Sequence, residues 1–257
     1  MQGMGSQGRV AVIGGSGARF AAASGSDRPG LSDTPWGPPS AAVRELRIGD
    51  HGVLFLARHG EPHAIAPHRV NYRANIHALH ASGATHVIAL NTVGGISAEA
   101  VPGSLWLPGQ IIDYTSGRES SFHDGTVWPL QHQEFAEPYD RPLRELLMLA
   151  AEQAGIAIFS GGVYGCTQGP RLETAAEIRR MQRDGCDLVG MTGMPEAALA
   201  RELGMAYASI SMVVNPAAGL SADAITLEAI LREADHCMTR CTAVLARALP
   251  LLDQPPG

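Results

Sequence analysis

Short β-branched segments alternate with helical patterns along this chain, and the alternation constrains the fold more than any other sequence feature. The segments that predict strands are Val10–Ile13, Val53–Ala57, Val87–Leu90, Leu105–Leu107, Gly162–Gly165, Leu188–Met191 and Ser209–Val214. Helical patterns cover Asn71–His80, Arg141–Ala154, Thr174–Asp184, Pro195–Leu203 and Thr226–Leu249. Strands that alternate with helices are typical of α/β proteins with a mainly parallel sheet.

The composition favours one α/β domain in a reducing compartment. The chain has 257 residues, of which 45% are hydrophobic, and this suits a single sizeable core. Four cysteines that lack CxxC spacing and a secretory leader predict reduced thiols in a cytoplasmic protein. We expect one domain over residues 9–252, flexible tails at 1–8 and 253–257, and a long surface loop at 21–40.

The net charge of −6 predicts no broad basic surface for nucleic acid or anionic membrane. No apolar run approaches the roughly 18 residues that a membrane span needs. Seven histidines fall between residues 51 and 86, but no HExxH or comparable carboxylate pattern accompanies them, so no metal site is predicted. A small anionic substrate remains possible because one local arginine can outweigh a weak overall field.

Small and hydrogen-bonding residues follow the predicted strands where charged turns would be ordinary. GGSG follows the first strand, RHG the second and NTVGG the third, and later strands end in GCTQGPRLET, GMTGMPE and NPAAG. In open α/β sheets ligands bind beyond the carboxyl ends of the strands. Backbone N–H groups, hydroxyls and a guanidinium that converge there form an anion site.

Each motif alone also fits a plainer interpretation. GGSG lacks the GxGxxG spacing of a dinucleotide site and equally fits a tight turn, although Ser16 could donate to a phosphate. Arg58 stands at a strand end, where its fork suits phosphate, but a surface salt bridge is the alternative. Glu173 and Glu196 fit helix N-terminal charges, and Asn215 fits a turn cap. Cys166 has no evident base partner and is interpreted as structural.

Taken together, the motifs resemble the trimeric purine nucleoside phosphorylases, and within them the branch that acts on 5′-methylthio nucleosides. The resemblance runs from about residue 9 to about residue 250, through VIGGSG, DTPWGPPS, ARHGEPHAIAPHRVNYRANIHAL, FHDGT, AEPY, GPRLETAAEIR and MTGMPEAALARELGMAYASISMVVN. It implies a three-layer α/β/α fold with a central mixed, largely parallel sheet. It also implies a pentosyltransferase that needs no cofactor, with inorganic phosphate as co-substrate, acting as a cytoplasmic homotrimer or hexamer.

The resemblance also implies roles for individual residues. Phosphate would contact Ser16, Arg58, His59, Asn91, Thr92 and Thr192, the ribose Met191, and the base Leu172, Glu173, Asn215, Pro216 and Ala217. His132 matches a histidine that reaches the neighbouring subunit's pocket. Leu227 takes the place of the histidine that meets the 5′-hydroxyl in ordinary 6-oxopurine phosphorylases.

Two departures from the relatives define the expected substrate. The adenine-specific methylthio branch carries Asp and Ser where this chain has Asn215 and Glu173, so a 6-oxopurine is expected. An apolar Leu227 would suit a methylthio group. The first expectation is phosphorolysis of S-methyl-5′-thioinosine to hypoxanthine and 5-methylthioribose 1-phosphate. A 5′-methylthioadenosine phosphorylase, a general inosine/guanosine phosphorylase and a non-catalytic nucleoside-binding module stay open as alternatives.

Overall fold

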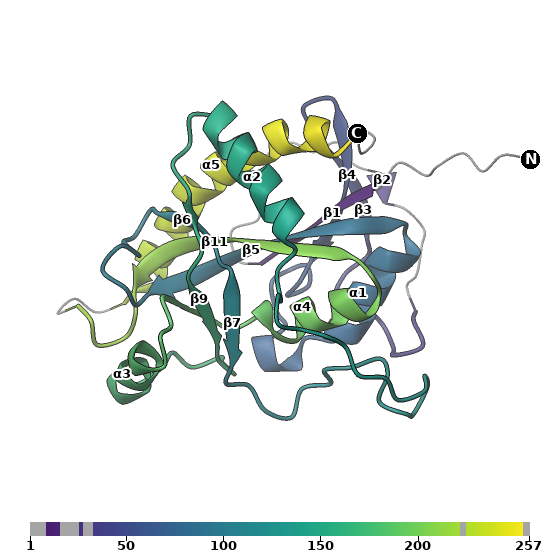
Figure 1. The fold of residues 1–257 in the computed structure, drawn as a ribbon, viewed down its shortest axis with the longest axis horizontal. Helices are drawn as coiled ribbons and strands as arrows, with labels where there is room; N and C mark the ends of the chain where they lie inside the picture. The colour runs from purple at the N-terminus through teal and green to yellow at the C-terminus, as the bar shows by residue number, and fades with distance from the viewer. Residues whose placement is uncertain (1–8, 16–25, 28–32, 222–224, 254–257) are drawn as a thin grey trace, which may run out of the picture.

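The core of the molecule is one mixed sheet built around a long central strand (Figure 1). A computed structural model describes residues 9–15, 26–27, 33–221 and 225–253. Within them the sheet has eleven strands, in the order β2-β3-β4-β1-β5-β10-β9-β7, with β11, β6 and β8 branching from β5. The strands are β1 (Arg9–Gly14), β2 (Ser26–Asp27), β3 (Arg44–Ile48), β4 (His51–Ala57), β5 (Ala84–Gly95), β6 (Leu105–Leu107), β7 (Gln110–Asp113), β8 (Phe159–Ser160), β9 (Val163–Cys166), β10 (Leu188–Gly190) and β11 (Ala206–Pro216).

The central strands are parallel, which places their carboxyl ends at one edge of the sheet. β5 pairs in parallel with β1 on one side and with β11 on the other, and β1 pairs in parallel with β4. β10 runs antiparallel to the end of β5 and parallel to β9. The predicted α/β class with a mixed, largely parallel sheet is therefore confirmed.

Helices cover both faces of the sheet (Figure 1). α2 (Arg141–Gln153) and α5 (Leu227–Leu252) pack on one face, and α1 (Tyr72–Ala81) and α4 (Gly193–Glu202) on the other, each pair over its own apolar cluster. α3 (Ala175–Arg183) and a 3₁₀ turn, η1 (Pro67–Arg69), complete the helical elements of the described residues. Every predicted helix is present, within a few residues of its predicted ends.

The structure describes parts of the predicted surface loop and of the predicted C-terminal tail. Residues 33–40, part of the predicted surface loop, dock on α1: Asn71 donates to the carbonyl of Trp36 at 2.7 Å, and Ser40 N–H donates to Asn75 Oδ1 at 2.7 Å. Asp253 of the predicted tail lies 2.7 Å from His51. Residues 1–8 and 254–257 lie outside the described residues, so the tails stay a prediction.

Candidate active site

The carboxyl ends of β1, β4, β5, β10 and β11 surround a cavity of about 430 Å³. Ten of the predicted site residues line it: Arg58, His59, Asn91, Thr92, Leu172, Glu173, Met191, Thr192, Asn215 and Ala217. They come from segments that are far apart in the sequence. The parallel register brings the strand ends together, as the sequence predicted.

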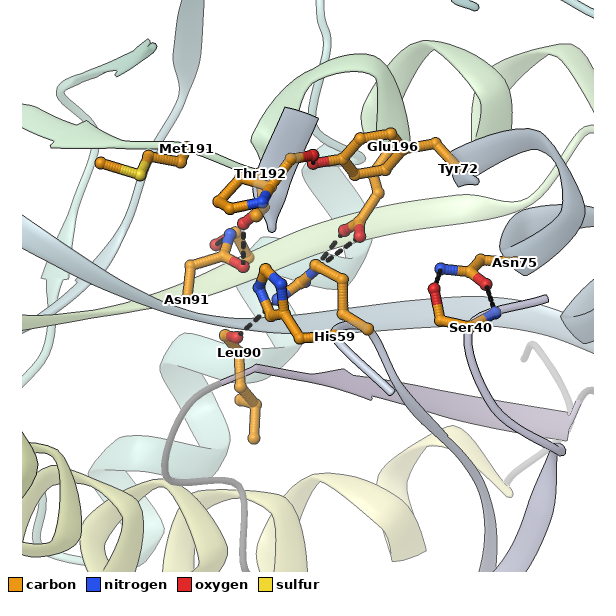
Figure 2. Close-up of polar contacts among 12 residues, drawn as sticks. Ser40, His59, Tyr72, Asn75, Leu90, Asn91, Met191, Thr192 and Glu196 are labelled. Carbon is orange, nitrogen blue, oxygen red and sulfur yellow. Dashed lines mark hydrogen bonds and ion pairs between the residues drawn. The ribbon is translucent and has the colours of Figure 1, made fainter. Parts of the chain in front are cut away.

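The side of the cavity that Arg58 lines, called the floor below, is backed by a buried ion pair with Glu196, which does not itself line the cavity (Figure 2). Arg58 is 1% exposed and Glu196, in the first turn of α4, is 0% exposed. Arg58 Nε donates to one oxygen of Glu196, and Arg58 Nη2 donates to the other at 3.0 Å. Tyr207 adds a hydrogen bond to the same carboxylate at 3.0 Å. Burial alone would lower the pKa of Arg58, but the charge of Glu196 holds that pKa above its ordinary value.

The remaining edge of the Arg58 guanidinium faces the cavity beside Gly15. Arg58 Nη1 donates to the carbonyl of Leu90 at 3.3 Å. A β-carbon on Gly15 would stand 3.2 Å from Arg58 Nη1 and 3.6 Å from His59 Nε2. The bare backbone of Gly15 therefore leaves space between two nitrogen-bearing side chains, and this is space that an anion can occupy.

His59 is buried and held neutral. Its Nδ1 donates to the carbonyl of Ile65 at 2.7 Å, which leaves Nε2 toward Gly15. Burial, and then the neighbouring positive charge of Arg58, lower the pKa of His59 to about 4. In this tautomer the unprotonated Nε2 is an acceptor, so it can take a hydrogen bond from a hydroxyl group such as that of hydrogen phosphate.

A chain of small polar groups fixes the wall beside Arg58 (Figure 2). Thr192 Oγ1 donates to Asn91 Oδ1 at 3.3 Å, and Asn91 Nδ2 donates to Ser209 Oγ at 2.9 Å. Thr192 occupies the N-cap position of α4, yet its side chain forms no capping bond. Its hydroxyl is thus held at the cavity by Asn91 instead of by the helix.

The two glycines of NTVGG, Gly94 and Gly95, have different surroundings. Gly94 lines the cavity, whereas a β-carbon on Gly95 would lie 1.8 Å from the carbonyl oxygen of Ala100. A side chain at position 95 would therefore collide with backbone. Gly95 has a packing reason that is separate from any anion site.

A carboxylate and an amide stand at another wall of the cavity. Glu173 Oε1 accepts from Thr167 Oγ1 at 2.7 Å. Asn215 follows a register shift in the pairing of β11 with β5; such a bulge re-aims the side chains around it. Asn215 Nδ2 donates to the carbonyl of Pro216 at 2.6 Å. Pro216 itself does not line the cavity, although Asn215 and Ala217 do.

The predicted 5′-pocket residue lies elsewhere. Leu227 is the first residue of α5, is 71% exposed and does not line the cavity. Ile225 and Ile230 line it instead. They stand at the N′ and N4 positions around the Thr226 cap, a pair that commonly forms a hydrophobic staple. At the start of α5 the cavity is therefore lined by these two isoleucines and not by Leu227.

Two further predicted residues are Ser16 and His132. Ser16 lies outside the described residues. His132 is exposed in the single chain, within the irregular segment 114–140, and does not line the cavity. Cys166 is fully buried, and burial raises the pKa of its thiol to about 12, which agrees with its interpretation as a structural residue.

Sequence reasoning missed the role of Glu196. An acidic residue in the first turn of a helix fits an ordinary helix-dipole charge, and nothing local separates that case from a buried counter-ion. The signal that could have found it is the apolar sequence around it, MPEAALA, since a carboxylate among buried residues needs a partner.

Comparison with known proteins places these features in a family. The model of the phosphorylase superfamily matches residues 9–250. A "Probable S-methyl-5'-thioinosine phosphorylase" of Xanthomonas campestris pv. campestris is 52% identical over 227 residues, which are 88% of this chain and 91% of that relative. A "6-oxopurine nucleoside phosphorylase" of Pyrococcus furiosus is 41% identical over 249 residues, 95% of this chain and 93% of that relative.

Solved structures agree with the sequence comparison. A methylthioadenosine phosphorylase from Schistosoma mansoni in complex with adenine superposes with a TM-score of 0.87 at 30% identity, over 95% of this chain and 91% of that chain. The predicted three-layer fold and the predicted family are both confirmed. This chain, with Arg58, His59, Thr192, Glu173 and Asn215 gathered in one cavity, belongs to the phosphorylase superfamily.

Proposed function

We propose that this protein catalyses the phosphorolysis of S-methyl-5′-thioinosine, releasing hypoxanthine and 5-methylthioribose 1-phosphate. The observation that carries the proposal is the meeting of a phosphate-type floor and a carboxylate–amide wall in one cavity. The enzyme would be a pentosyltransferase that serves purine salvage. Phosphate is a co-substrate, and the reaction as proposed uses no metal or other cofactor.

Phosphate would occupy the space beside Gly15. Arg58 Nη1 would donate to one phosphate oxygen, and His59 Nε2 would accept from the P–OH group. The hydroxyls of Thr192 and Thr92, the amide of Asn91 and, from the sequence, Ser16 would complete the site. Because Glu196 already balances the charge of Arg58, binding would depend on placed hydrogen bonds as well as on net charge.

The chemistry requires charge stabilisation at both ends of the glycosidic bond. As that bond breaks, the ribose gains oxocarbenium character and negative charge develops on the purine. Phosphate stabilises the cation and then bonds to C1′, which orientation within the cavity makes effective. A hydrogen of the Asn215 amide would stabilise charge at N7 or O6, in the manner of electrostatic catalysis. Met191 would lie against the ribose, and Leu172 and Ala217 against the base.

Glu173 and Asn215 favour a 6-oxopurine over adenine. A 6-oxopurine presents N1–H, which Glu173 can accept with the carboxylate oxygen that Thr167 does not use, and O6, to which Asn215 can donate. Adenine has an unprotonated N1, and the lone pair of this nitrogen would face the Glu173 carboxylate, which cannot donate a hydrogen bond to it. A pocket that hydrogen-bonds its substrate rejects a mispaired analogue by about 10⁴-fold or more. The relatives named for thioinosine and 6-oxopurine nucleosides support this choice.

An apolar 5′ end favours a methylthio group over a hydroxyl. Ile225 and Ile230 bring only hydrocarbon to the cavity. A buried 5′-hydroxyl without a partner would cost about 1–3 kcal/mol. We assign the 5′-methylthio group to this end of the cavity.

The protein would work as a cytoplasmic homotrimer in which His132 completes the site of a neighbouring subunit. Support comes from the exposed position of His132 on segment 114–140, together with Val127 and Leu130, which are 53% and 70% exposed. None of the helices in the described residues is long and apolar enough to cross a membrane.

The decisive experiment compares methylthioinosine, methylthioadenosine, inosine and adenosine, each with and without phosphate. The proposal expects phosphate-dependent release of hypoxanthine, with methylthioinosine the best substrate by at least about 10-fold over inosine and about 10⁴-fold over methylthioadenosine. A preference for methylthioadenosine would overturn the roles of Glu173 and Asn215. No turnover of any of the four would favour a nucleoside-binding module.

A further inference from the structure

Arg118 lies at the centre of contacts that none of the assigned roles explains. It belongs to segment 114–140, which connects β7 to α2 without a helix or strand. Its guanidinium donates to backbone carbonyls of two segments, called the strand-end loops below: residues 167–168 after β9, and residues 191–194 after β10, which run into the kinked start of α4. Nη2 donates to Thr167 and Gln168 at 3.1 and 2.9 Å, and Nη1 donates to Met191 and Met194 at 2.9 and 2.6 Å.

Two more contacts surround the same guanidinium. Arg118 Nε donates to the side chain of Gln168 at 3.2 Å, and Nη1 donates to the hydroxyl of Tyr72 at 3.2 Å. The guanidinium carbon also lies 5.2 Å from the centre of the Tyr72 ring. Within the described residues no carboxylate forms an ion pair with Arg118. Its charge is therefore met by carbonyl and hydroxyl oxygens, and a planar guanidinium bonded to backbone atoms fixes the backbone itself.

Each of the two loops carries a different part of the proposed site. Thr167 holds Glu173 through its hydroxyl at 2.7 Å, so its loop sets the carboxylate that meets the base. Met191 lines the cavity and precedes Thr192, which meets phosphate. Tyr72 in turn donates to the carbonyl of Pro67 at 2.9 Å, and Pro67 also lines the cavity.

We propose that Arg118 is a positioning residue that sets the base-binding loop against the phosphate-binding loop. This rests on the proposed function, because it assigns the two loops to the two co-substrates. Arg118 does not line the cavity, so it acts only through the loops that it holds. Removal of the Arg118 guanidinium would therefore displace both loops at once, whereas a substitution within one loop would displace that loop alone.

The test is steady-state kinetics of Arg118→Met with methylthioinosine and phosphate varied in turn. We expect kcat/KM to fall by about 10- to 100-fold for each co-substrate, since small misplacements of positioned groups have costs of this order. Arg118→Lys keeps the charge but not the planar fork, and we expect an intermediate loss. Thr167→Val removes the hydroxyl that holds Glu173 at 2.7 Å and also reaches the carbonyl of Gly190 at 3.3 Å, but the Thr167 N–H still donates to that carbonyl at 2.8 Å. This variant should therefore raise KM for the nucleoside and leave KM for phosphate within about twofold of wild type.

Arg73→Met is the matched control. Arg73 is bonded to the same segment, through Asp124 at 2.9 Å, Glu119 at 2.9 Å and the carbonyl of Ser121 at 3.3 Å, but to neither strand-end loop. It should lower the melting temperature without the paired fall in kcat/KM for the two co-substrates. Equal kinetic losses in Arg73→Met and Arg118→Met would overturn the inference, as would a change confined to one co-substrate in Arg118→Met.

Two further outcomes keep this inference separate from the proposed function. An inactive wild-type protein would reject the proposed function, whereas an active wild type with unchanged kinetics in Arg118→Lys and Arg118→Met would reject the inference alone. If Arg118→Met does not fold, the kinetics of Arg118→Lys decide, with a loss for both co-substrates supporting the inference. Addition of guanidinium ion at millimolar concentration to Arg118→Ala should restore part of both losses, and sodium chloride at equal concentration should not.

Discussion

At the scale of single residues, the site depends on charges that are buried and compensated. Arg58 and Glu196 are both almost completely removed from water. A buried ion pair adds little stability compared with apolar residues of the same shape, but loss of one partner leaves the other charge buried without a counter-ion. The same burial explains why His59 is neutral although it lies beside a proposed anion site.

Glu196→Gln should reduce the free energy of unfolding by about 3–5 kcal/mol, because it leaves the Arg58 charge buried without a counter-ion. Urea denaturation of the purified variant measures this loss. Glu145→Gln is the control: Glu145 also pairs with an arginine, but at the surface, with side chains 62% and 77% exposed. It should change stability by less than about 1 kcal/mol, and equal losses in the two variants would contradict the buried-pair argument.

His59 makes stability depend on pH in a defined direction. Its pKa is 6.5 in the unfolded reference and about 4 in the folded chain. Between these values the unfolded chain binds a proton that the folded chain does not, so stability falls as pH drops from about 6.5 to about 4. Unfolding by urea across this pH range should show a shallower decline in His59→Gln than in wild type. Parallel curves would mean that His59 does not titrate as described.

At the scale of elements, helix starts and strand bends place the side chains that matter. Thr174 caps α3 through a capping box with Glu177, directly after Glu173. The bulge in β11 precedes Asn215, and Ile225 and Ile230, which line the cavity, flank the Thr226 cap at the start of α5. Helix caps and a strand irregularity thus position the side chains of the proposed site.

Thr174→Ala should cost about 0.5–2 kcal/mol of stability, because it removes an N-cap hydrogen bond. Denaturation measures it, with Thr239→Ala as the control, since Thr239 is an exposed residue within α5 whose hydroxyl bonds only its own helix at Asp235. The control should stay within about 0.5 kcal/mol of wild type. A loss no larger than that of the control would show that the cap is dispensable.

The start of α5 can be tested through substrate preference. Ile230→Asn should improve kcat/KM for inosine relative to methylthioinosine by about 10-fold, since an amide can meet the 5′-hydroxyl that isoleucine leaves unpaired. Leu227→Asn, three residues earlier and 71% exposed, should leave that ratio unchanged. A shift in Leu227→Asn alone would restore Leu227 to the role that the sequence assigned to it.

At the scale of the whole molecule, the segment between β7 and α2 bears on how copies of the chain would meet. Segment 114–140 carries both Arg118, which is anchored inside the chain, and His132, which is exposed. If copies form the proposed trimer, this one segment would connect a subunit's own strand-end loops to its neighbour's site.

Sedimentation should give a trimer, and His132→Ala should raise KM for methylthioinosine by about 10-fold while leaving KM for phosphate nearly unchanged, because the lost contact is to the nucleoside alone. The kinetics and the sedimentation are measured on the same preparation. A monomer with full activity would remove the basis for a shared site.

The sequence by itself determined the α/β class, the helices and most strands, the family and the strand-end residues of the cavity. The class, the elements and the meeting of the strand ends follow from periodicity and from the parallel sheet, which must bring the carboxyl ends of its strands together. The family follows from the resemblance of the motifs. β3 (RELRI) and β7 (QIID) escaped prediction because charged and polar residues interrupt their apolar pattern, whereas the shorter β6 (LWL) and β10 (LVG) are apolar and buried throughout. Only the tertiary structure decided that Glu196 balances Arg58, that Ile225 and Ile230 line the cavity while Leu227 does not, and that Arg118 joins two loops. Burial and direction of a side chain depend on neighbours distant in the sequence, and local pattern does not record them.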